Sequence, residues 1–246
     1  MIRRSLRRLL KKVLKILSKI AINKHKIRIV AVSGWYRTWI LKESLYFALR
    51  DDYKVRRNLN DVHWDFSIPL VILGYKDVNY SFRGWFQIIL STISVLLFEK
   101  SNPNVLILEL DANQDEIIKY WLEIIEPEVL LLGNTRPGME YSEHLLVNGI
   151  KRDGTLICTQ KQKQKFIDKK ILRDDLRVIT HEEVKDIEFD LKAFFPPVIW
   201  DSLMLSIPVT EVFGIPHEEL SEKLSYFEIP EIKLRKAKIL VNGIEE

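Results

Sequence analysis

From residue 27 onward the chain alternates short apolar runs with amphipathic helical stretches, and this order constrains the fold more than any other feature. The apolar runs are rich in β-branched residues and lie at Ile27–Val32, Val105–Leu110, Val129–Leu132 and Gly154–Cys158. Continuous apolar runs are typical of strands that are buried on both faces. Strand–helix–strand order implies right-handed crossovers between parallel strands. The sequence therefore predicts an α/β fold, with a mostly parallel sheet flanked by helices.

The segments between and after these runs have helical periodicity. We expect helices at Leu41–Leu49, Asp115–Ile125, Trp200–Phe213 and Pro216–Phe227. Another apolar segment, Ile68–Leu73, contains Pro69. The polar and basic stretch from Lys161 to Lys170 is expected to form an exposed turn and the start of a helix.

The composition excludes several classes of protein. Apolar residues make up 47% of the 246 residues and charged residues 29%, which is typical of a globular chain. The single cysteine, Cys158, excludes a disulfide framework and a cysteine-based zinc cluster, and it fits a reducing compartment. We expect the thiol to be packed inside a strand. His63, His144 and His181 lack the spacing of metal ligands.

The first 26 residues differ in charge from the rest of the chain. They contain ten Lys or Arg residues and no acidic residue, whereas the remainder has more acidic than basic residues. Apolar residues recur at spacings of three and four and form a stripe: Leu6, Leu9, Leu10, Val13, Leu14, Leu17, Ile20 and Ala21. Basic residues cover the opposite face: Arg3, Arg4, Arg7, Arg8, Lys11, Lys12, Lys15 and Lys19. The pattern predicts a basic amphipathic helix over residues 1–26.

Three interpretations of this helix remain open. A helix of this kind binds the surface of an anionic membrane, to which each basic residue contributes about 1 kcal/mol. Alternatively, its apolar stripe packs on the body of the protein. The absence of aromatic residues from the basic stretch disfavours the third interpretation, nucleic-acid binding. The charges that interrupt the apolar run exclude both a secretory signal and a membrane span, so we expect a cytoplasmic protein, peripheral on the inner face of the plasma membrane under the first interpretation.

A second apolar stretch, Trp85–Phe98, is interrupted by polar residues and is too short to cross a bilayer. We expect a buried or interfacial helix here. Under the membrane interpretation it would reinforce the contact that the first helix makes.

Functional groups in open parallel sheets gather at the carboxyl ends of the strands. This rule points to Ser33–Trp39, Glu109–Asp111 and Gly133–Met139. Glu109 and Asp111 could hold Mg²⁺ as a carboxylate pair, or they could cap the turn or helix that follows.

The order of several segments resembles the central ATP-binding domain of the Mur ligase family, with its P-loop-NTPase-like topology. The type that adds D-alanyl-D-alanine to the UDP-N-acetylmuramoyl-tripeptide is the most similar. The similarity is carried by the strand and loop at Ile27–Glu43, Ser-Ile-Pro-Leu-Val-Ile-Leu-Gly at Ser67–Gly74, Leu-Glu-Leu-Asp-Ala at Leu108–Ala112, Pro127, and Phe213–Pro216 with the helix after it. It covers roughly residues 27–240 and implies the fold of that domain.

The residues that the resemblance would place in the nucleotide site are mostly changed. A P-loop binds phosphate through glycine backbone N–H groups, a lysine and a Ser or Thr. Only Gly34 keeps its expected type, since Arg37 stands for the second glycine, Thr38 for the lysine and Trp39 for the metal-binding threonine.

Beyond the P-loop, the resemblance places the metal-binding histidine at Met139 and the modified lysine near Glu143 or His144. The family's nucleotide-contacting His-Asn pair falls at Val198–Ile199. Glu109 is kept as the acidic partner of the metal. We expect Trp35, Tyr36 and Trp39 to fill the emptied pocket or to form a protein-contact surface.

The resemblance implies a chain of two parts, the basic helix at 1–26 and a Mur-ligase-like domain at 27–246, without the family's uridine-nucleotide-binding and carboxyl-terminal domains. The first hypothesis for its function is a pseudoenzyme, a membrane-peripheral scaffold or regulatory subunit of peptidoglycan precursor synthesis with an active Mur ligase as partner. The second is an ATP-dependent ligase subunit that needs a partner chain. It would bind ATP and Mg²⁺ through Gly34, Arg37, Thr38 and Glu109. The third is a module that binds anionic lipid or nucleic acid through residues 1–26.

Overall fold

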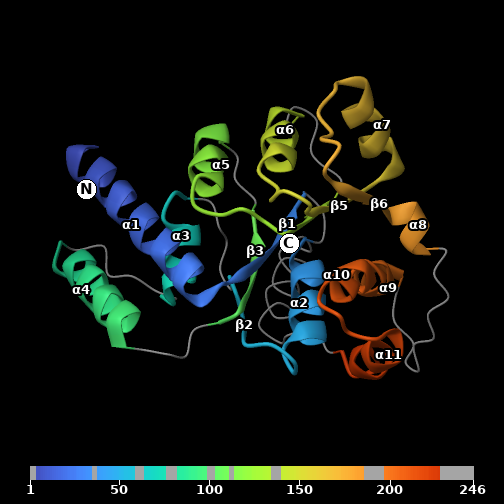
Figure 1. The fold of residues 1–246 in the computed structure, drawn as a ribbon, viewed down its shortest axis with the longest axis horizontal. Coiled ribbons are helices and arrows are strands. Elements are labelled where there is room, and N and C mark those ends of the chain that lie inside the picture. The colour runs from blue at the N-terminus through green and yellow to red at the C-terminus, as the bar shows by residue number, and fades with distance from the viewer. Residues whose placement is uncertain are drawn as a thin grey trace, which may run out of the picture.

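A six-stranded parallel sheet with helices on both faces forms the centre of the computed structural model (Figure 1). The structure describes residues 4–34, 38–58, 64–75, 82–98, 103–110, 114–133, 140–185 and 197–227. The strand order is β2-β3-β1-β4-β5-β6, and every neighbouring pair is parallel. The strands are β1 (Arg28–Ser33), β2 (Val55–Arg57), β3 (Val105–Glu109), β4 (Val129–Leu132), β5 (Thr155–Cys158) and β6 (Arg177–Thr180). The predicted α/β fold with a parallel sheet is confirmed.

Eleven helices lie in the described residues: α1 (Arg4–His25), α2 (Thr38–Leu49), α3 (Ser67–Leu73), α4 (Phe82–Phe98), α5 (Asp115–Leu122), α6 (Glu140–Asn148), α7 (Gln160–Asp168), α8 (His181–Lys185), α9 (Pro197–Met204), α10 (Ile207–Val212) and α11 (His217–Ser225). The segment expected as one helix at Trp200–Phe213 is divided between α9 and α10. Pro208 stands at the start of α10, where its missing N–H costs no helical hydrogen bond.

Alternating residues of the central strands bury both faces of the sheet. Ile29 and Ala31 of β1 pack with α1, α3, α5, α6 and α7, whereas Val30 and Val32 pack with α2, α9, α10 and α11. In Figure 1, α5, α6 and α7 lie above the sheet and α2, α9, α10 and α11 below it, with α1 and α3 at the left. The unbroken apolar runs of the sequence reflect this burial on two sides.

The two edge strands were not predicted from the sequence. β2 has three residues, two of them arginines, and β6 begins with an exposed arginine. An edge strand is covered less than a central one, so it lacks the continuous apolar run by which the inner strands were recognised.

Helix α1 packs one apolar stripe on the body of the protein. Leu10, Leu14 and Leu17 are buried, and Arg7 and Lys11 form ion pairs with the buried carboxylate of Asp65. For these side chains the structure supports the second interpretation of the basic helix, in which its apolar stripe packs on the body of the protein.

The expected helix at Trp85–Phe98 is present as part of α4, which packs on α1 and is partly buried. Trp85 and Ile88 pack on Leu10, Leu14 and Phe66, while Phe86 is exposed. Among the helices in the described ranges, none combines the length and the apolar character needed to cross a bilayer.

Candidate nucleotide site at the carboxyl end of the sheet

The carboxyl ends of β1 and β3 bring three of the predicted site residues together. Gly34 follows β1, Thr38 begins α2, and Glu109 ends β3. The hydroxyl of Thr38 donates a hydrogen bond to Oε1 of Glu109 over 2.6 Å. The strand-end rule thus located the cluster correctly.

A lysine that the sequence analysis did not single out completes the cluster. Lys42 lies one turn after Thr38 on α2, and its Nζ donates to Oε2 of Glu109 over 2.6 Å. The lysine side chain is 1% exposed and the glutamate side chain 16%. Both carboxylate oxygens of Glu109 are therefore engaged, one by a hydroxyl and the other by a buried ammonium group.

The backbone of Glu109 is held as firmly as its side chain. Its N–H donates to Oδ1 of Asn58 over 2.9 Å, and Nδ2 of Asn58 donates to its carbonyl oxygen over 3.3 Å. On the neighbouring strand, the hydroxyl of Ser33 donates to the carbonyl oxygen of Leu110 over 2.8 Å. These bonds orient the end of β3 and so place the carboxylate of Glu109 against α2.

Gly34 allows the chain to leave β1 in close contact with the end of β4. Its φ of +146° is a backbone conformation that L side chains rarely adopt, and a Cβ there would lie 3.0 Å from Cα of Gly133. The N–H of Gly133 donates to the carbonyl oxygen of Ser33 over 2.8 Å. A glycine is needed at position 34 because both the conformation and the space exclude a side chain.

A second buried carboxylate lies on the other side of Gly133. Glu143 of α6 has a side chain that is 2% exposed, and its Oε2 accepts a hydrogen bond from Lys165 of α7 over 2.7 Å. Gln162 donates to the carbonyl oxygen of Gly133 over 2.9 Å and lies 3.4 Å from Oε1 of Glu143. The resemblance puts the family's modified lysine close to Glu143, and here the position carries a carboxylate paired with a lysine.

These residues do not fit a magnesium site of the kind that the resemblance implies. A Mg²⁺ ion needs free carboxylate oxygens, and the ammonium group of Lys42 occupies one oxygen of Glu109 while Thr38 occupies the other. Within the described ranges, no group of three or more His, Cys, Asp or Glu side chains is arranged to hold a metal ion.

Several predicted residues lie outside the described part of the chain. These are Arg3, Trp35, Tyr36, Arg37, His63, Asp111 and Met139. The roles proposed for these residues, at the phosphate, in filling the pocket, beside the metal and, for Arg3, at the membrane, stay predictions.

The basic residues assigned to membrane contact separate into two groups. Arg7 and Lys11 pair with Asp65, and Lys15 pairs with Glu123 over 2.6 Å. Other basic side chains on α1 are exposed, namely Arg8, Lys12 and Lys19. The first group thus binds the protein's own carboxylates rather than an external surface.

Cys158 is a packed thiol, as expected. It is fully buried in β5, and burial raises the pKa of its thiol to about 12. A thiol with that pKa stays protonated at neutral pH and is a poor nucleophile.

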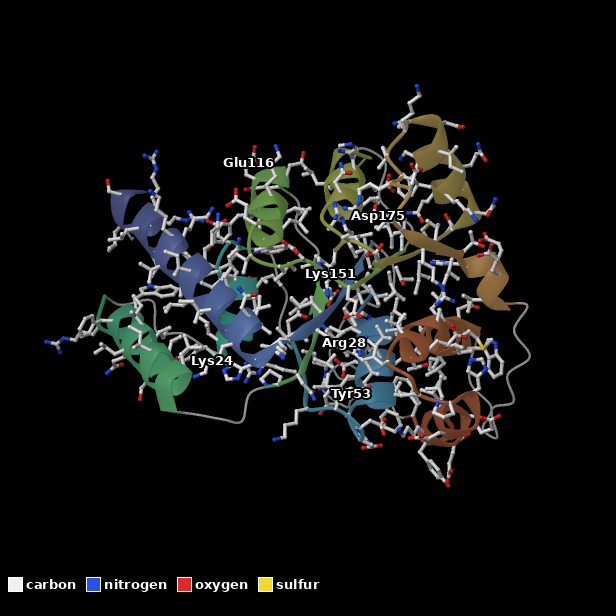
Figure 2. All side chains as sticks on the ribbon, viewed as in Figure 1. Lys24, Arg28, Tyr53, Glu116, Lys151 and Asp175 are labelled. Atoms are coloured by element: carbon white, nitrogen blue, oxygen red, sulfur yellow. The ribbon has the colours of Figure 1, made fainter. Side chains whose placement is uncertain are left out.

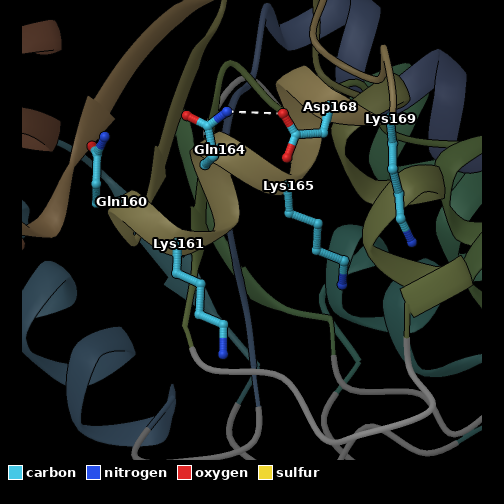
Figure 3. Close-up of a pocket in the computed structure, with 6 residues that line it drawn as sticks. All are labelled: Gln160, Lys161, Gln164, Lys165, Asp168 and Lys169. Carbon is cyan, nitrogen blue, oxygen red and sulfur yellow. Dashed lines mark hydrogen bonds between the residues drawn. The ribbon is translucent and has the colours of Figure 1, made fainter.

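An open groove of 620 Å³ runs along α7 and is lined by side chains of that helix and the residue after it (Figure 3). Gln164 donates to Asp168 across one turn, and Lys165 on the same helix is the partner of Glu143. Of the side chains that line this groove, Lys165 is thus already paired with the buried carboxylate of Glu143.

Sequence signals existed for some of the missed contacts. Lys42 stands four residues after Thr38 in a helix, and this spacing places both side chains on one face. Thr159 and Gln162 have the spacing of a capping box, which the structure forms at the start of α7. The pairing of Glu143 with Lys165 had no such signal, because two separate helices bring them together.

Comparisons with known proteins support the fold. No protein-family model and no curated protein sequence matches the chain. Among solved structures, MurF ligase from Thermotoga maritima in complex with ADP matches with a TM-score of 0.65 at 13% identity, over 89% of this chain and 53% of that one. A MurF from Acinetobacter baumannii matches with a TM-score of 0.66 at 14% identity, over 89% and 50% of the two chains.

The similarity extends to related ligases. The UDP-N-acetylmuramate:L-alanyl-gamma-D-glutamyl-meso-diaminopimelate ligase from Neisseria meningitides matches with a TM-score of 0.58 at 14% identity, over 88% of this chain and 70% of that one. The chain spans about half the length of the two MurF structures. Over the part that it spans, the chain has the α/β fold of the Mur ligases.

Proposed function

We propose that this chain is a Mur-ligase-like protein without ligase activity, which acts as a membrane-peripheral scaffold or regulatory subunit in peptidoglycan precursor synthesis. The observation that carries the proposal is the ion pair of Lys42 with Glu109. The resemblance assigns that carboxylate to a metal, and here a lysine of the same chain neutralises it.

The second carboxylate supports the same conclusion. Glu143 stands near the position of the family's modified lysine, and the ammonium group of Lys165 neutralises it. The carboxylates of Glu109 and Glu143 are thus both paired with lysines of the same chain. A carboxylate that is already paired with an ammonium group has little attraction for a divalent cation, and nucleotide phosphates bind in such enzymes together with that cation.

We propose a scaffold or regulatory role because the chain keeps the Mur ligase fold while the residues expected for ligase activity are changed. The partner that we propose is an active Mur ligase or another enzyme of cell-wall synthesis, and the basic helix α1 supports a position at an anionic membrane surface. The fold similarity to MurF and to the Neisseria ligase is the support for the pathway.

One observation favours the second hypothesis, a ligase subunit with an altered phosphate loop. Gly34 retains the backbone conformation that only glycine adopts readily, and α2 begins at Thr38 directly after the loop. The first N–H groups of a helix are unpaired within it and attract anions. This arrangement would support the binding of a nucleotide without a metal ion.

Isothermal titration calorimetry of the full 246-residue chain with ATP and with ADP, with and without Mg²⁺, separates the two hypotheses. We expect no heat of binding at millimolar nucleotide, and a full-length MurF ligase titrated in the same buffer is the positive control. A Kd below about 100 μM, or roughly −5.5 kcal/mol, would overturn the loss of nucleotide binding and favour the ligase subunit. In that case Gly34→Val should abolish the binding.

The regulatory role needs its own test. The steady-state rate of an active MurF ligase should change saturably, in kcat or in KM, when this chain is added. A matched addition of the heat-denatured chain controls for crowding. An unchanged rate, together with no complex in sedimentation velocity, would overturn the regulatory role for that ligase.

A further inference from the structure

The exposed apolar side chains of this protein are concentrated on two neighbouring helices. Eight large hydrophobic side chains are exposed among the described residues, and six of them belong to α1 and α4. They are between 41% and 58% exposed: Leu9, Ile16 and Ile20 on α1, and Phe86, Leu90 and Ile93 on α4. We call these six residues the outer apolar face.

The residues on α1 form a stripe separate from the one that packs on the body. Leu9, Ile16 and Ile20 are seven and four residues apart, so they share one side of the helix. The buried residues Leu10 and Leu14 lie on another side. Folding of the body therefore leaves the outer stripe of α1 uncovered.

Helix α4 repeats this division. Trp85 and Ile88 face the body, whereas Phe86, Leu90 and Ile93 are exposed. The ammonium group of Lys24 near the end of α1 donates to the carbonyl oxygen of Leu96 near the end of α4. Figures 1 and 2 show the two helices side by side at one edge of the molecule, with Lys24 at the end where they meet.

The charged side chains of the two helices that carry the outer apolar face have a single sign. Neither α1 nor α4 contains an acidic residue. Arg8, Lys12 and Lys19 are exposed on α1, and they form no ion pair within the described part of the chain. Arg83 is exposed on α4.

Apolar side chains bordered by unpaired cations fit the surface of an anionic bilayer, in which acyl chains and negative headgroups lie at adjacent depths. A second copy of this chain fits less well, because the two cationic faces would repel each other.

We propose that the outer apolar face of α1 and α4 is the surface by which this protein docks on an anionic membrane, with Arg8, Lys12 and Lys19 contacting the headgroups. The inference deepens the proposed peripheral role and rests on it. In this proposal α1 has two roles. Leu10 and Leu14 hold the helix on the body of the protein, while Leu9 and Ile16 enter the membrane interface.

Co-sedimentation of the full chain with vesicles tests the proposal. Vesicles of phosphatidylglycerol mixed with phosphatidylcholine should pellet the protein, and vesicles of phosphatidylcholine alone should not. The apolar variant Ile16→Ser/Leu90→Ser should lower the partition coefficient at least about tenfold, since both side chains lose burial in the interface. The matched control is Ile167→Ser on α7, which removes a 50% exposed side chain from another surface and should leave binding unchanged.

The cations need a separate variant. Lys12→Gln/Lys19→Gln should also lower binding at least about tenfold and weaken its salt dependence. Lys161→Gln on α7 is the control for a lost charge, and thermal unfolding verifies that each variant is folded.

Three outcomes would overturn the proposal: equal binding to both kinds of vesicle, unchanged binding of the α1–α4 variants, or a dimer in sedimentation equilibrium that Ile16→Ser/Leu90→Ser dissociates. None of these outcomes depends on nucleotide or on a ligase, so the calorimetric and kinetic tests above stay decisive for the loss of ligase activity.

Discussion

The ammonium group of Lys42 lies 2.6 Å from the carboxylate of Glu109 at the carboxyl end of the sheet, and the lysine side chain is 1% exposed. Removing one partner of a buried pair leaves the other charge uncompensated, which costs more than the pair contributes. The pair is therefore a structural element at the end of β3, with a measurable effect on stability.

Replacing this lysine tests that role directly. Lys42→Met should lower the free energy of unfolding by about 3 kcal/mol, because Glu109 stays partly buried without its cation. Urea denaturation at neutral pH measures the change.

The matching controls concern charge and burial. Lys161→Met removes an exposed lysine and should change stability by less than about 0.5 kcal/mol. Lys42→Met/Glu109→Gln should regain part of the loss, since neither charge is then left buried. A Lys42→Met variant as stable as the Lys161→Met variant would show that the pair is not structural.

The contact between Gly34 and Gly133 predicts that alanine lowers the stability of the protein more at position 34 than at position 133. Gly34→Ala should destabilise the protein by about 1–3 kcal/mol, since its φ is unfavourable and its Cβ would press on Cα of Gly133. A Cβ on Gly133 would lie 3.6 Å from the carbonyl oxygen of Ser33, an ordinary contact, so Gly133→Ala should cost less. Thermal unfolding compares the two variants, and equal losses would contradict the prediction.

The attachment of α1 depends on Asp65, whose buried carboxylate lies 2.9 Å from Arg7 and 3.2 Å from Lys11. Asp65→Asn should cost about 1 kcal/mol, because both cations lose their charged partner. Faster hydrogen exchange of the α1 amides should accompany the loss. Glu123→Gln removes the exposed partner of Lys15 and should have almost no effect; a larger effect than that of Asp65→Asn would refute the assignment.

Glu128 makes stability depend on pH. Hydrogen bonds from Arg28, over 2.8 and 2.7 Å, hold the pKa of this carboxyl below its ordinary value. A lowered pKa stabilises the fold above the ordinary value, near pH 4.5, and the contribution is lost as pH falls through the lowered pKa. Glu128→Gln should therefore cost about 1 kcal/mol at pH 7 and less near pH 3.

Urea denaturation at both pH values measures this difference. Asp201→Asn removes a surface carboxylate and is the control for the loss of a negative charge. A stability gap between wild type and Glu128→Gln that is constant with pH would contradict the role of the Arg28 hydrogen bonds.

The inner strands of the sheet could be predicted, because a strand that is buried on both faces has a continuous run of apolar residues. The apolar runs at Val129–Leu132 and Val105–Leu110 were recognisable for this reason. Short edge strands such as Val55–Arg57 have no comparable run, so only their pairing with a neighbour makes them strands.

The candidate site was predictable in position but not in chemistry. The end of β3 identified Glu109, and the resemblance gave it a metal. The partner that it has instead, Lys42, lies 67 residues away in sequence, and only the packing of α2 against β3 brings the two together. The division of α1 into an inner and an outer stripe could not be predicted for a similar reason. Both stripes are apolar, and only the packing of the body and of α4 against α1 decides which stripe is buried.

The ion pairs of α1 also have a consequence for synthesis on the ribosome. The helix is made first, but Asp65 follows Arg7 by 58 residues and Glu123 follows Lys15 by 108. At a translation rate of roughly 5–20 residues per second, the second partner is made about 5–20 s after the helix. Until then Lys15 has no carboxylate partner, and the inner apolar stripe of the nascent helix has no complete body on which to pack.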